Sequence, residues 1–404
     1  MTDDYAAPVD IFQLKSKGLQ HHGLRQNNLR VVLNVIGFNA GLSNAEIARM
    51  SGLAPQTVSA ILNDLEREGL IVRGPVLRGR RGQPAMPISL RAEGGYSIGI
   101  EIGWRHAEVV IIDLHATIVG HRRLTYSYPD PRTIIDQVAG LARALMEELP
   151  PESRARLLDA GIAMPGRMAQ ALASLGASED VVTLWAELAP AAELEQRLGL
   201  SVYAYKDGNA ACWGELIALQ APRPASFIYL LVSTYVGAGI FGDGRLWEGA
   251  TDNSADLGSM LIRVDGDRTR AAHHIASLSA LEARLRQAGF SVDLDDGENW
   301  DLAAMETEIE AWIGDAARAL AVVIFNTMRV IDAGLIVVDT VLPALSDRLV
   351  ARVEAELEKL PTANALSPKV QRGRLGHLSP AVGAAELPLY RRHFSRMQSM
   401  DPHR

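Results

Sequence analysis

Residues 43–70 have the sequence SNAEIARMSGLAPQTVSAILNDLEREGL, whose caps and apolar spacing predict two short helices joined by a tight turn. Ser43 and Glu46 form a capping box, in which the serine caps the first helix and the glutamate reaches back to the serine amide. Ser51-Gly52-Leu53 is a turn of the kind that joins two crossed helices. Pro55 then opens the second helix, at a position where its missing N–H costs nothing.

The helix that begins near Pro55 has an apolar stripe and a polar face. The apolar positions are Val58, Ile61, Leu62 and Leu65. An amphipathic helix expected over residues 28–38 makes this the third helix of the pattern, which is the place of a recognition helix. Glutamine and asparagine can bond adenine edges, and threonine and serine can reach bases or phosphates. The expected DNA contacts on the polar face are Gln56, Thr57, Ser59 and Asn63.

Two predicted strands, residues 69–73 and 86–90, enclose a hairpin rich in glycine and arginine. A flexible cationic tip of this kind can follow phosphates or enter a narrow minor groove, where the negative potential is deepest. The hairpin therefore predicts a wing beside the helix-turn-helix. Its expected DNA contacts are Arg78, Arg80 and Arg81.

Charge is unevenly distributed along the chain. Residues 15–91 hold 11 Lys+Arg against 4 Asp+Glu, a net +7, and residues 92–404 hold 29 against 41, a net −12. Residues 1–14 supply the other −3 of the formal −8. A basic segment ahead of a large acidic body favours a nucleic-acid module joined to a domain that binds another ligand.

Length and composition bound the class of protein. The 404 residues are 48% apolar and 22% charged, which is typical of a soluble globular protein with two or three domains. The single cysteine, Cys212, excludes a disulfide framework and a cysteine-rich zinc site. No uninterrupted apolar run reaches the roughly 18 residues of a transmembrane helix, and the acidic N-terminus lacks a signal-peptide core. We therefore expect a cytoplasmic protein with no membrane partner.

From Tyr96 the pattern becomes that of an α/β fold. Strands are expected at residues 97–102, 107–113, 118–126 and 158–163, with a helix over 131–148. A second half is expected to begin near Val202, with strands at 227–232 and 335–338 and helices over 278–287 and 303–329. Two halves, each a β-meander followed by helices, describe the two-lobed actin-like, ribonuclease H-like fold.

Several local motifs carry a resemblance to a known family. Besides residues 43–70, they are Gly161-Ile162-Ala163-Met164-Pro165-Gly166, Asp207-Gly208-Asn209-Ala210-Ala211 with Glu215, and Gly242-Asp243-Gly244-Arg245-Leu246 with Gly249-Ala250 and Leu257-Gly258. In this order and spacing, the chain resembles the ROK family (repressors, open reading frames and kinases), and specifically its winged-helix transcriptional regulators. The resemblance extends from about Leu24 to Phe394.

The resemblance and the patterns together predict the domain organisation. An N-terminal tail of residues 1–22 precedes a winged helix-turn-helix DNA-binding domain, residues 23–91. A ROK-like sugar-binding domain in two lobes covers residues 95–394, and a second tail covers 395–404.

Three stretches depart from the ROK kinase pattern. The kinase loop Asp-x-Gly-Gly-Thr, which holds ATP phosphates and the metal, is Glu101-Ile102-Gly103-Trp104-Arg105 here. A second phosphate turn, Gly-Thr-Gly, is Ser233-Thr234-Tyr235, and a glycine pair after the last strand that admits adenosine is Asp339-Thr340. Each change adds bulk or negative charge where a nucleotide must lie. We therefore expect no kinase activity, no catalytic residue and no cofactor.

The zinc motif of the family, a histidine followed by Cys-x-Cys-Gly-x-x-Gly-Cys, is absent. Its histidine position falls at Ser259, and its three cysteine positions fall at Thr269, Ala271 and Ala276. His273 and His274 lie within this stretch, but adjacent residues are expected to point apart on regular structure. We expect no metal site, and packing must then hold this stretch together.

The resemblance implies a sugar pocket that is partly retained. Asp207 matches the catalytic base of the family, and without ATP its carboxylate can still accept hydrogen bonds from sugar hydroxyls. Lys206 replaces an asparagine of that pocket, Asp256 stands where the family has a hydroxyl-binding glutamate, and Ser259 replaces the histidine. The last glutamate of the motif falls near Leu278. The expected ligand-binding residues are Gly166, Lys206, Asp207, Asp256 and Ser259.

Two interpretations of Lys206 and Asp207 stay open. They either bind a ligand, in which case Lys206 would favour an anionic or oxidised sugar, or they form only a structural ion pair between lobes.

The leading hypothesis is a sequence-specific transcriptional regulator, a repressor of carbohydrate-metabolism genes. A dimer or tetramer would bind two-fold operator DNA and respond to a sugar-like effector between the lobes. The alternatives are a sugar kinase with a DNA-binding head and a DNA-binding dimer that needs no ligand.

Overall fold

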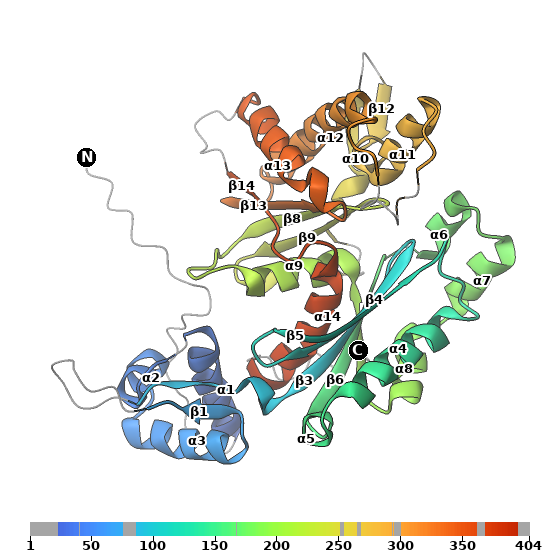
Figure 1. Ribbon diagram of the computed structural model, residues 1–404. Coiled ribbons are helices and arrows are strands. Elements are labelled where there is room, and N and C mark those ends of the chain that lie inside the picture. The colour runs from blue at the N-terminus through green and yellow to red at the C-terminus, as the bar shows by residue number, and fades with distance from the viewer. Residues whose placement is uncertain are drawn as a thin grey trace, which may run out of the picture.

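The computed structural model describes residues 23–39, 41–75, 86–166, 168–250, 254–264, 268–292, 294, 300–361 and 368–394 (Figure 1). The two predicted tails, 1–22 and 395–404, lie outside the described residues, as do Arg78, Arg80 and Arg81 of the predicted wing. Among the described helices, none is both long enough and apolar enough to cross a membrane.

The N-terminal head consists of three helices and a two-stranded hairpin. Its elements are α1 (Gly23–Phe38), α2 (Asn44–Ser51), α3 (Pro55–Arg67), β1 (Ile71–Arg73) and β2 (Ile88–Leu90). The capping box is confirmed, because the Ser43 amide donates to Glu46 Oε2 at 2.8 Å and the Glu46 amide donates to Ser43 Oγ at 3.3 Å. The predicted stripe of α3 is buried, and β1 pairs antiparallel with β2 as a wing requires. The first helix begins at Gly23 rather than at Asn28.

Lobe 1 is built on a five-stranded sheet in the order β5-β4-β3-β6-β7. The strands are β3 (Tyr96–Ile102), β4 (His106–Asp113), β5 (Ile118–Thr125), β6 (Leu157–Met164) and β7 (Val202–Lys206). Its helices are α4 (Ile134–Glu148), α5 (Pro151–Arg154), α6 (Met168–Leu172), α7 (Glu179–Glu187) and α8 (Pro190–Leu198). The strand β7 pairs in parallel with β6, so the prediction that a second half begins near Val202 is wrong. A strand of five residues gives no local sign of the sheet that it joins.

Lobe 2 has a second five-stranded sheet in the order β10-β9-β8-β13-β14. The strands are β8 (Phe227–Val232), β9 (Val236–Gly242), β10 (Arg245–Leu246), β13 (Leu335–Thr340) and β14 (Lys369–Arg372). One face is covered by α10 (His273–Ala276), α11 (Leu278–Gln287), α12 (Glu306–Thr327) and α13 (Pro343–Glu358). A hairpin of β11 (Leu261–Val264) and β12 (Arg268–Ala271) lies beside α12. The helix α9 (Asp207–Ala218) packs on the other face.

The helix α14 (Ser379–Leu389) lies in the middle of the molecule, between the sheet of lobe 1 and α9 (Figure 1). Glycines allow this close approach. A Cβ on Gly99 of β3 would lie 1.9 Å from the Ala381 carbonyl oxygen, and a Cβ on Gly383 would lie 1.7 Å from that of Ala210. All residues of α14 are buried, and a π-helical turn (Tyr390–Phe394) continues it.

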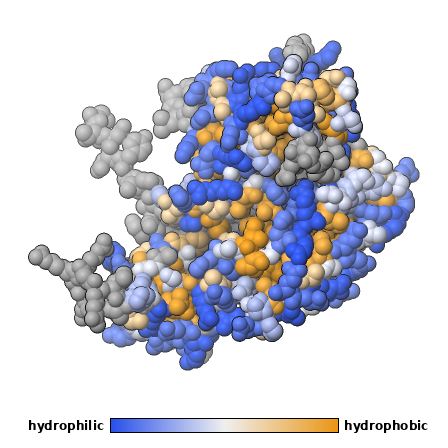
Figure 2. All heavy atoms as spheres, in the orientation of Figure 1, coloured by the Kyte–Doolittle hydropathy of each residue, from blue (hydrophilic) through white to orange (hydrophobic). Residues whose placement is uncertain are grey.

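The head and the body share one hydrophobic core. Head residues such as Val32 and Leu65 belong to the same buried cluster as Ile112 of β4 and Val382 and Leu389 of α14. In Figure 2, hydrophobic residues gather toward the middle of this face, and hydrophilic residues dominate its periphery. A continuous core between two domains favours rigid transmission over free movement of the head.

Polar contacts reinforce this junction. The side-chain amide of Asn34 in α1 donates to the Phe394 carbonyl at 2.6 Å. Arg156 Nη1 donates to the carbonyl of Glu93 at 3.1 Å and to that of Gly69 at 3.4 Å, and His115 Nε2 lies 3.0 Å from the Leu90 carbonyl. These contacts link both ends of the wing to lobe 1.

Glu386 gives the core of α14 a predicted pH dependence. Burial raises the pKa of Glu386 to about 8, with Asp113 raising it further and Arg223 opposing. The folded state therefore keeps a proton that the unfolded chain loses, so this stabilisation is complete below the ordinary glutamate pKa and is lost as the pH rises toward 8. Between pH 6 and 7.5, Glu386→Gln should gain about 2 kcal/mol of unfolding free energy relative to the natural chain. Urea unfolding at both pH values measures this; a constant difference between the two proteins would refute it.

Candidate DNA-binding surface and ligand cleft

The first turn of α3 presents Gln56 and Thr57 to solvent. Both side chains are exposed, and Val58 next to them is buried, so the helix is held by its apolar stripe while its N-terminal polar residues point outward. The N-terminal residues of a recognition helix are the ones that contact base edges. Gln56 and Thr57 therefore remain the candidates for direct base contact.

Ser59 and Asn63 have partners inside the head. Ser59 Oγ accepts a hydrogen bond from Asn44 Nδ2 at 2.8 Å and donates to the Pro55 carbonyl at 2.9 Å. Asn63 Oδ1 accepts from Arg73 Nη2 at 2.7 Å. These bonds tie α3 to the start of α2 and to the wing strand β1, and so orient the polar face.

Asn44 and Arg73 were missed by the sequence reasoning, although they lie next to the predicted contacts. Asn44 begins α2 and was considered only as part of the capping box. Arg73 ends β1, where its Nε also lies 3.1 Å from Glu66 Oε2. Their types were visible as a polar residue at a helix start and a cation at a wing strand, but only the fold brings them to α3.

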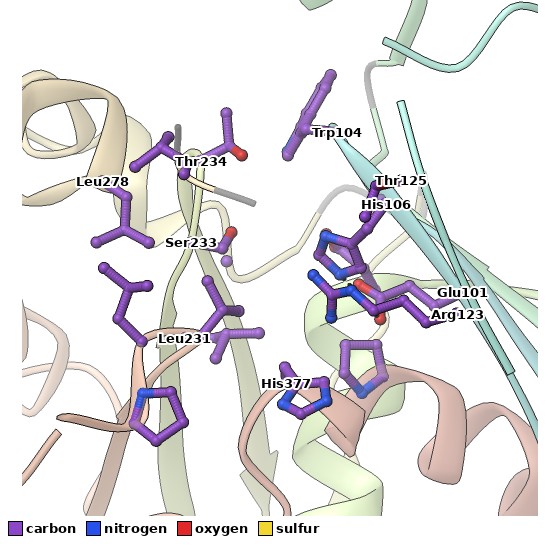
Figure 3. Close-up of a pocket in the computed structure, with 18 of the residues that line it drawn as sticks. Glu101, Trp104, His106, Arg123, Thr125, Leu231, Ser233, Thr234, Leu278 and His377 are labelled. Atoms are coloured by element: carbon purple, nitrogen blue, oxygen red, sulfur yellow. Dashed lines mark ion pairs between the residues drawn. The ribbon is translucent and has the colours of Figure 1, made fainter. Parts of the chain in front are cut away.

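A cavity of about 740 Å³ lies between the two lobes. Lobe 1 contributes residues at the end of β3, including Glu101 and Trp104, and lobe 2 contributes Ser233 and Thr234 after β8 (Figure 3). Alternation along β3 places Ile98, Ile100 and Ile102 in the core under α4. Glu101 consequently lies on the opposite face of the sheet, the one that α14 and the cleft share with Gly99.

Asp207 lies at the start of α9 and lines this cavity. Its Oδ1 accepts a hydrogen bond from the Gly208 amide at 2.6 Å. Burial raises the pKa of Asp207, and Asp256 raises it further, while the Gly208 amide and Lys206 lower it. A Cβ on Gly208 would lie 2.0 Å from the Ala238 carbonyl oxygen, so glycine is required for α9 to start this close to β9.

The other predicted ligand residues are not among the described residues that line the cavity. Parallel strands β6 and β7 end side by side at Met164 and Lys206, so Gly166 and Asp207 emerge at the same sheet edge. The Lys206 ammonium donates to the Ser254 carbonyl at 2.5 Å. Asp256, half-buried, precedes a single 3-10 turn (Leu257–Ser259), whose exposed last residue is Ser259.

Two aromatic side chains, one from each lobe, pack against each other. The rings of Trp104 and Tyr235 are 5.0 Å apart between centroids and packed edge to face. Next to them, Arg105 Nη2 lies 3.3 Å from Glu282 Oε2, joining lobe 1 to α11 of lobe 2. We call the four residues of these two contacts the interlobe latch.

The two adjacent histidines do not point apart as expected. The rings of His273 and His274 are 4.3 Å apart between centroids at 74°, and His273 also packs against Tyr235 at 5.7 Å. They begin the short helix α10, where successive side chains are about 100° apart rather than on opposite faces as in a strand. Burial lowers the pKa of His273, and Asp256 opposes this shift. His273 thus packs beside Tyr235, a contact that the sequence did not predict.

Asp339 and Thr340 lie within β13, not after the last strand as predicted. Asp339 is buried, and its Oδ1 accepts hydrogen bonds from the Thr340 amide and from Ser346 Oγ, both at 2.8 Å. A Cβ on Gly373 would lie 2.7 Å from Asp339 Oδ2. The carboxylate therefore links β13 to the start of α13.

The described residues contain no group of three or more His, Cys, Asp or Glu side chains that could hold a metal ion. The β11–β12 pairing and α10, whose Ala276 is buried against α12, organise the stretch that contains His273 and His274.

Comparison with known proteins identifies the class. The chain is 27% identical over 372 residues to an uncharacterized protein, y4fQ, from Sinorhizobium fredii, covering 91% of this chain and 92% of that one. It is 25% identical over 252 residues to the xylose repressor of Bacillus subtilis, covering 61% of this chain and 63% of the repressor.

Two solved structures show the same fold. One is a ROK family transcriptional regulator, a homologue of the E. coli MLC protein, with a TM-score of 0.68 and 18% identity, covering 91% of this chain and 97% of that one. The other is a ROK family glucokinase from Streptomyces griseus, solved with glucose and AMPPNP, with a TM-score of 0.57 and 18% identity over 72% of this chain and 99% of that one.

A winged head on a sugar-kinase-like body defines a DNA-binding transcription regulator. Residues 26–72 match the winged helix-turn-helix DNA-binding domain. Residues 97–390 match the ROK family, to which this chain belongs.

Proposed function

We propose that this chain is a repressor of carbohydrate-metabolism genes that binds an operator through its head and a sugar in the cleft beside Asp207. The observation that carries the proposal is the continuous core between a winged head and a two-lobed sugar-kinase-like body. The name of its relative, the xylose repressor, supports a sugar as the effector. Such a protein acts on the chromosome, so the proposal also places it in the cytoplasm.

The cleft supports binding rather than phosphoryl transfer. Catalysis would need a phosphate cradle and a metal at the end of β3. That position holds the buried carboxyl of Glu101 and the indole of Trp104, which packs against Tyr235 where a second phosphate turn would lie. Asp207 lines the cleft, and its carboxylate can accept hydrogen bonds from sugar hydroxyls, with Gly166 and Lys206 at the same sheet edge. Asp256 and Ser259 complete the proposed set.

Coupling between the sugar and the operator follows from α14. This helix packs on α9, which begins at Asp207, and on the sheet that carries the head. A sugar that draws the lobes together would shift α14 against that sheet and tilt the two heads of a dimer. The two heads of a dimer can bind both operator half-sites only at one spacing, so the tilt weakens DNA binding. Because the coupling is reciprocal, bound DNA weakens sugar binding by the same factor.

Gln56→Ala tests the recognition surface. We expect it to weaken binding to DNA from upstream of its own gene by about tenfold and to leave binding to random DNA unchanged, because a bidentate base contact is lost. Gln287→Ala, an exposed glutamine at the end of α11, is the matched control. Fluorescence anisotropy at two salt concentrations separates this loss from a phosphate contact, which would reduce the salt dependence. Equal affinities for the two variants would contradict the assignment.

A sugar kinase with a DNA-binding head is the second candidate, supported by the fold that the chain shares with the glucokinase. ATP consumption with a panel of sugars distinguishes the two. Turnover above the no-sugar background would favour the kinase.

A further inference from the structure

The interlobe cavity has two chemically different walls (Figure 3). Lobe 2 lines it largely with apolar side chains: Leu231, Leu278, Leu294, Trp300, Leu302 and Leu342. Lobe 1 and the turn before α14 line it with polar side chains: Glu101, His106, His121, Arg123, Thr125 and His377. At about 740 Å³, the cavity is of the size that holds a small organic molecule.

The polar wall converges on one buried carboxylate. Glu108 is fully buried in β4, and its Oε1 accepts from Arg123 Nη1 at 2.5 Å while its Oε2 lies 2.6 Å from His121 Nε2. His377 Nε2 is 3.8 Å from Glu108 Oε1. Glu108 thus holds the donors Arg123 and His121 in place, and both of these side chains line the cavity.

Glu101 adds a further donor. Its side chain is 6% exposed, lines the cavity, and its Oε2 has no hydrogen-bond partner within the described structure. Burial and the nearby Asp207 raise the pKa of Glu101 well above its usual value, which favours the neutral form of the carboxyl. A neutral carboxyl can donate a hydrogen bond to an acceptor in the cavity.

We propose that this part of the cleft binds a second small molecule, a carboxylate with an apolar body and no phosphate. Its carboxylate would lie toward Arg123 and Glu101, and its aromatic or branched aliphatic part against the leucines of lobe 2. Such a ligand satisfies both walls at once, whereas an inorganic phosphate has no apolar part to place against the leucines of lobe 2. Asp207 is the one proposed sugar-binding residue among the described residues that line this cavity. The proposed acid site and the proposed sugar site therefore share Asp207 and otherwise use different residues.

The second ligand would act on the same equilibrium as the sugar. It contacts both lobes and would favour one interlobe arrangement, next to the latch contact of Trp104 with Tyr235. This makes the cleft a site for two inputs, one a sugar and one an organic acid. A titration with the acid alone does not depend on the sugar proposal, because it needs neither DNA nor sugar.

Isothermal titration of the full chain with phenylacetate, benzoate and 4-methylvalerate tests the proposal. We expect at least one acid to bind, and its neutral amide to bind about tenfold more weakly because the charge-assisted hydrogen bond is lost. Ala344→Trp fills the cavity from α13 and should weaken binding at least about tenfold. Ala355→Trp, an exposed position on the same helix, is the matched control and should bind normally.

Arg123→Met gives a second test of the polar wall, with circular dichroism to verify folding because Glu108 loses a partner. We expect it to abolish the preference for acid over amide. The proposal is overturned if no acid binds at concentrations up to about 10 mM, because a Kd above that value is too weak for a specific site. Equal binding to Ala344→Trp, or binding of inorganic phosphate as tight as that of the acid, would overturn it as well.

Discussion

Gly383→Ala is expected to destabilise the folded protein by about 4 kcal/mol or to prevent folding, because it inserts a methyl group between two helix backbones. A Cβ at Gly383 of α14 would lie 1.7 Å from the carbonyl oxygen and 2.4 Å from the carbonyl carbon of Ala210 in α9. Neither atom belongs to a flexible side chain, so the helices themselves must separate. That movement would open the buried cluster that α14 shares with the head.

Gly140→Ala is the matched control. Gly140 lies inside α4, and a Cβ added there would meet no neighbouring heavy atom within 4 Å. The same substitution there should stabilise the protein by up to about 1 kcal/mol, since alanine is the better helix former. Urea unfolding followed by circular dichroism measures both variants. If Gly383→Ala were within about 1 kcal/mol of the natural chain, the role of α14 as the rigid centre would be wrong.

Asp207→Asn is expected to make sugar-induced release from the operator much less sensitive to sugar while DNA affinity without sugar stays unchanged. The amide is nearly the same size, but it replaces an oxygen that can accept a hydrogen bond from a sugar hydroxyl with a donor. Loss of a charge-assisted bond at a buried site should raise the sugar concentration for half-release by about 100-fold.

Asp243→Asn serves as the control for Asp207→Asn. Asp243 is an exposed turn residue with φ of 51°, a conformation that asparagine adopts readily. Fluorescence anisotropy on operator DNA, titrated with sugar, compares the two variants with the natural chain. Equal midpoints for all three proteins would remove Asp207 from the sugar site.

Local signals in the sequence predicted the head well. The Ser43–Glu46 capping box, Pro55 at a helix start and the stripe of α3 depend on neighbours within a few residues, and the structure has all three. The helix α11 also has the predicted bounds, Leu278–Gln287. Such features are set by short-range hydrogen bonds and periodicity, which a single sequence displays.

Long-range pairing was the part that the sequence did not reveal. The strand β7 joins lobe 1 through β6, and Asp339 lies inside β13, because sheet order depends on partners far along the chain. The shared core of head and body is equally non-local, since it brings Val32 beside Leu389. For the same reason, the predicted ligand residues included Asp207 but not the cavity's polar wall around Glu108, whose members come from β4, β5 and the turn before α14.

The most direct test of the account is the effect of a sugar on operator binding by the full chain. Labelled DNA from upstream of its own gene would be bound at moderate salt and titrated with neutral and acidic sugars, with anisotropy as the readout. We expect one sugar to weaken specific binding by at least about tenfold, as coupled sites typically do. Specific binding that no sugar alters would contradict the account and favour a DNA-binding dimer that needs no ligand.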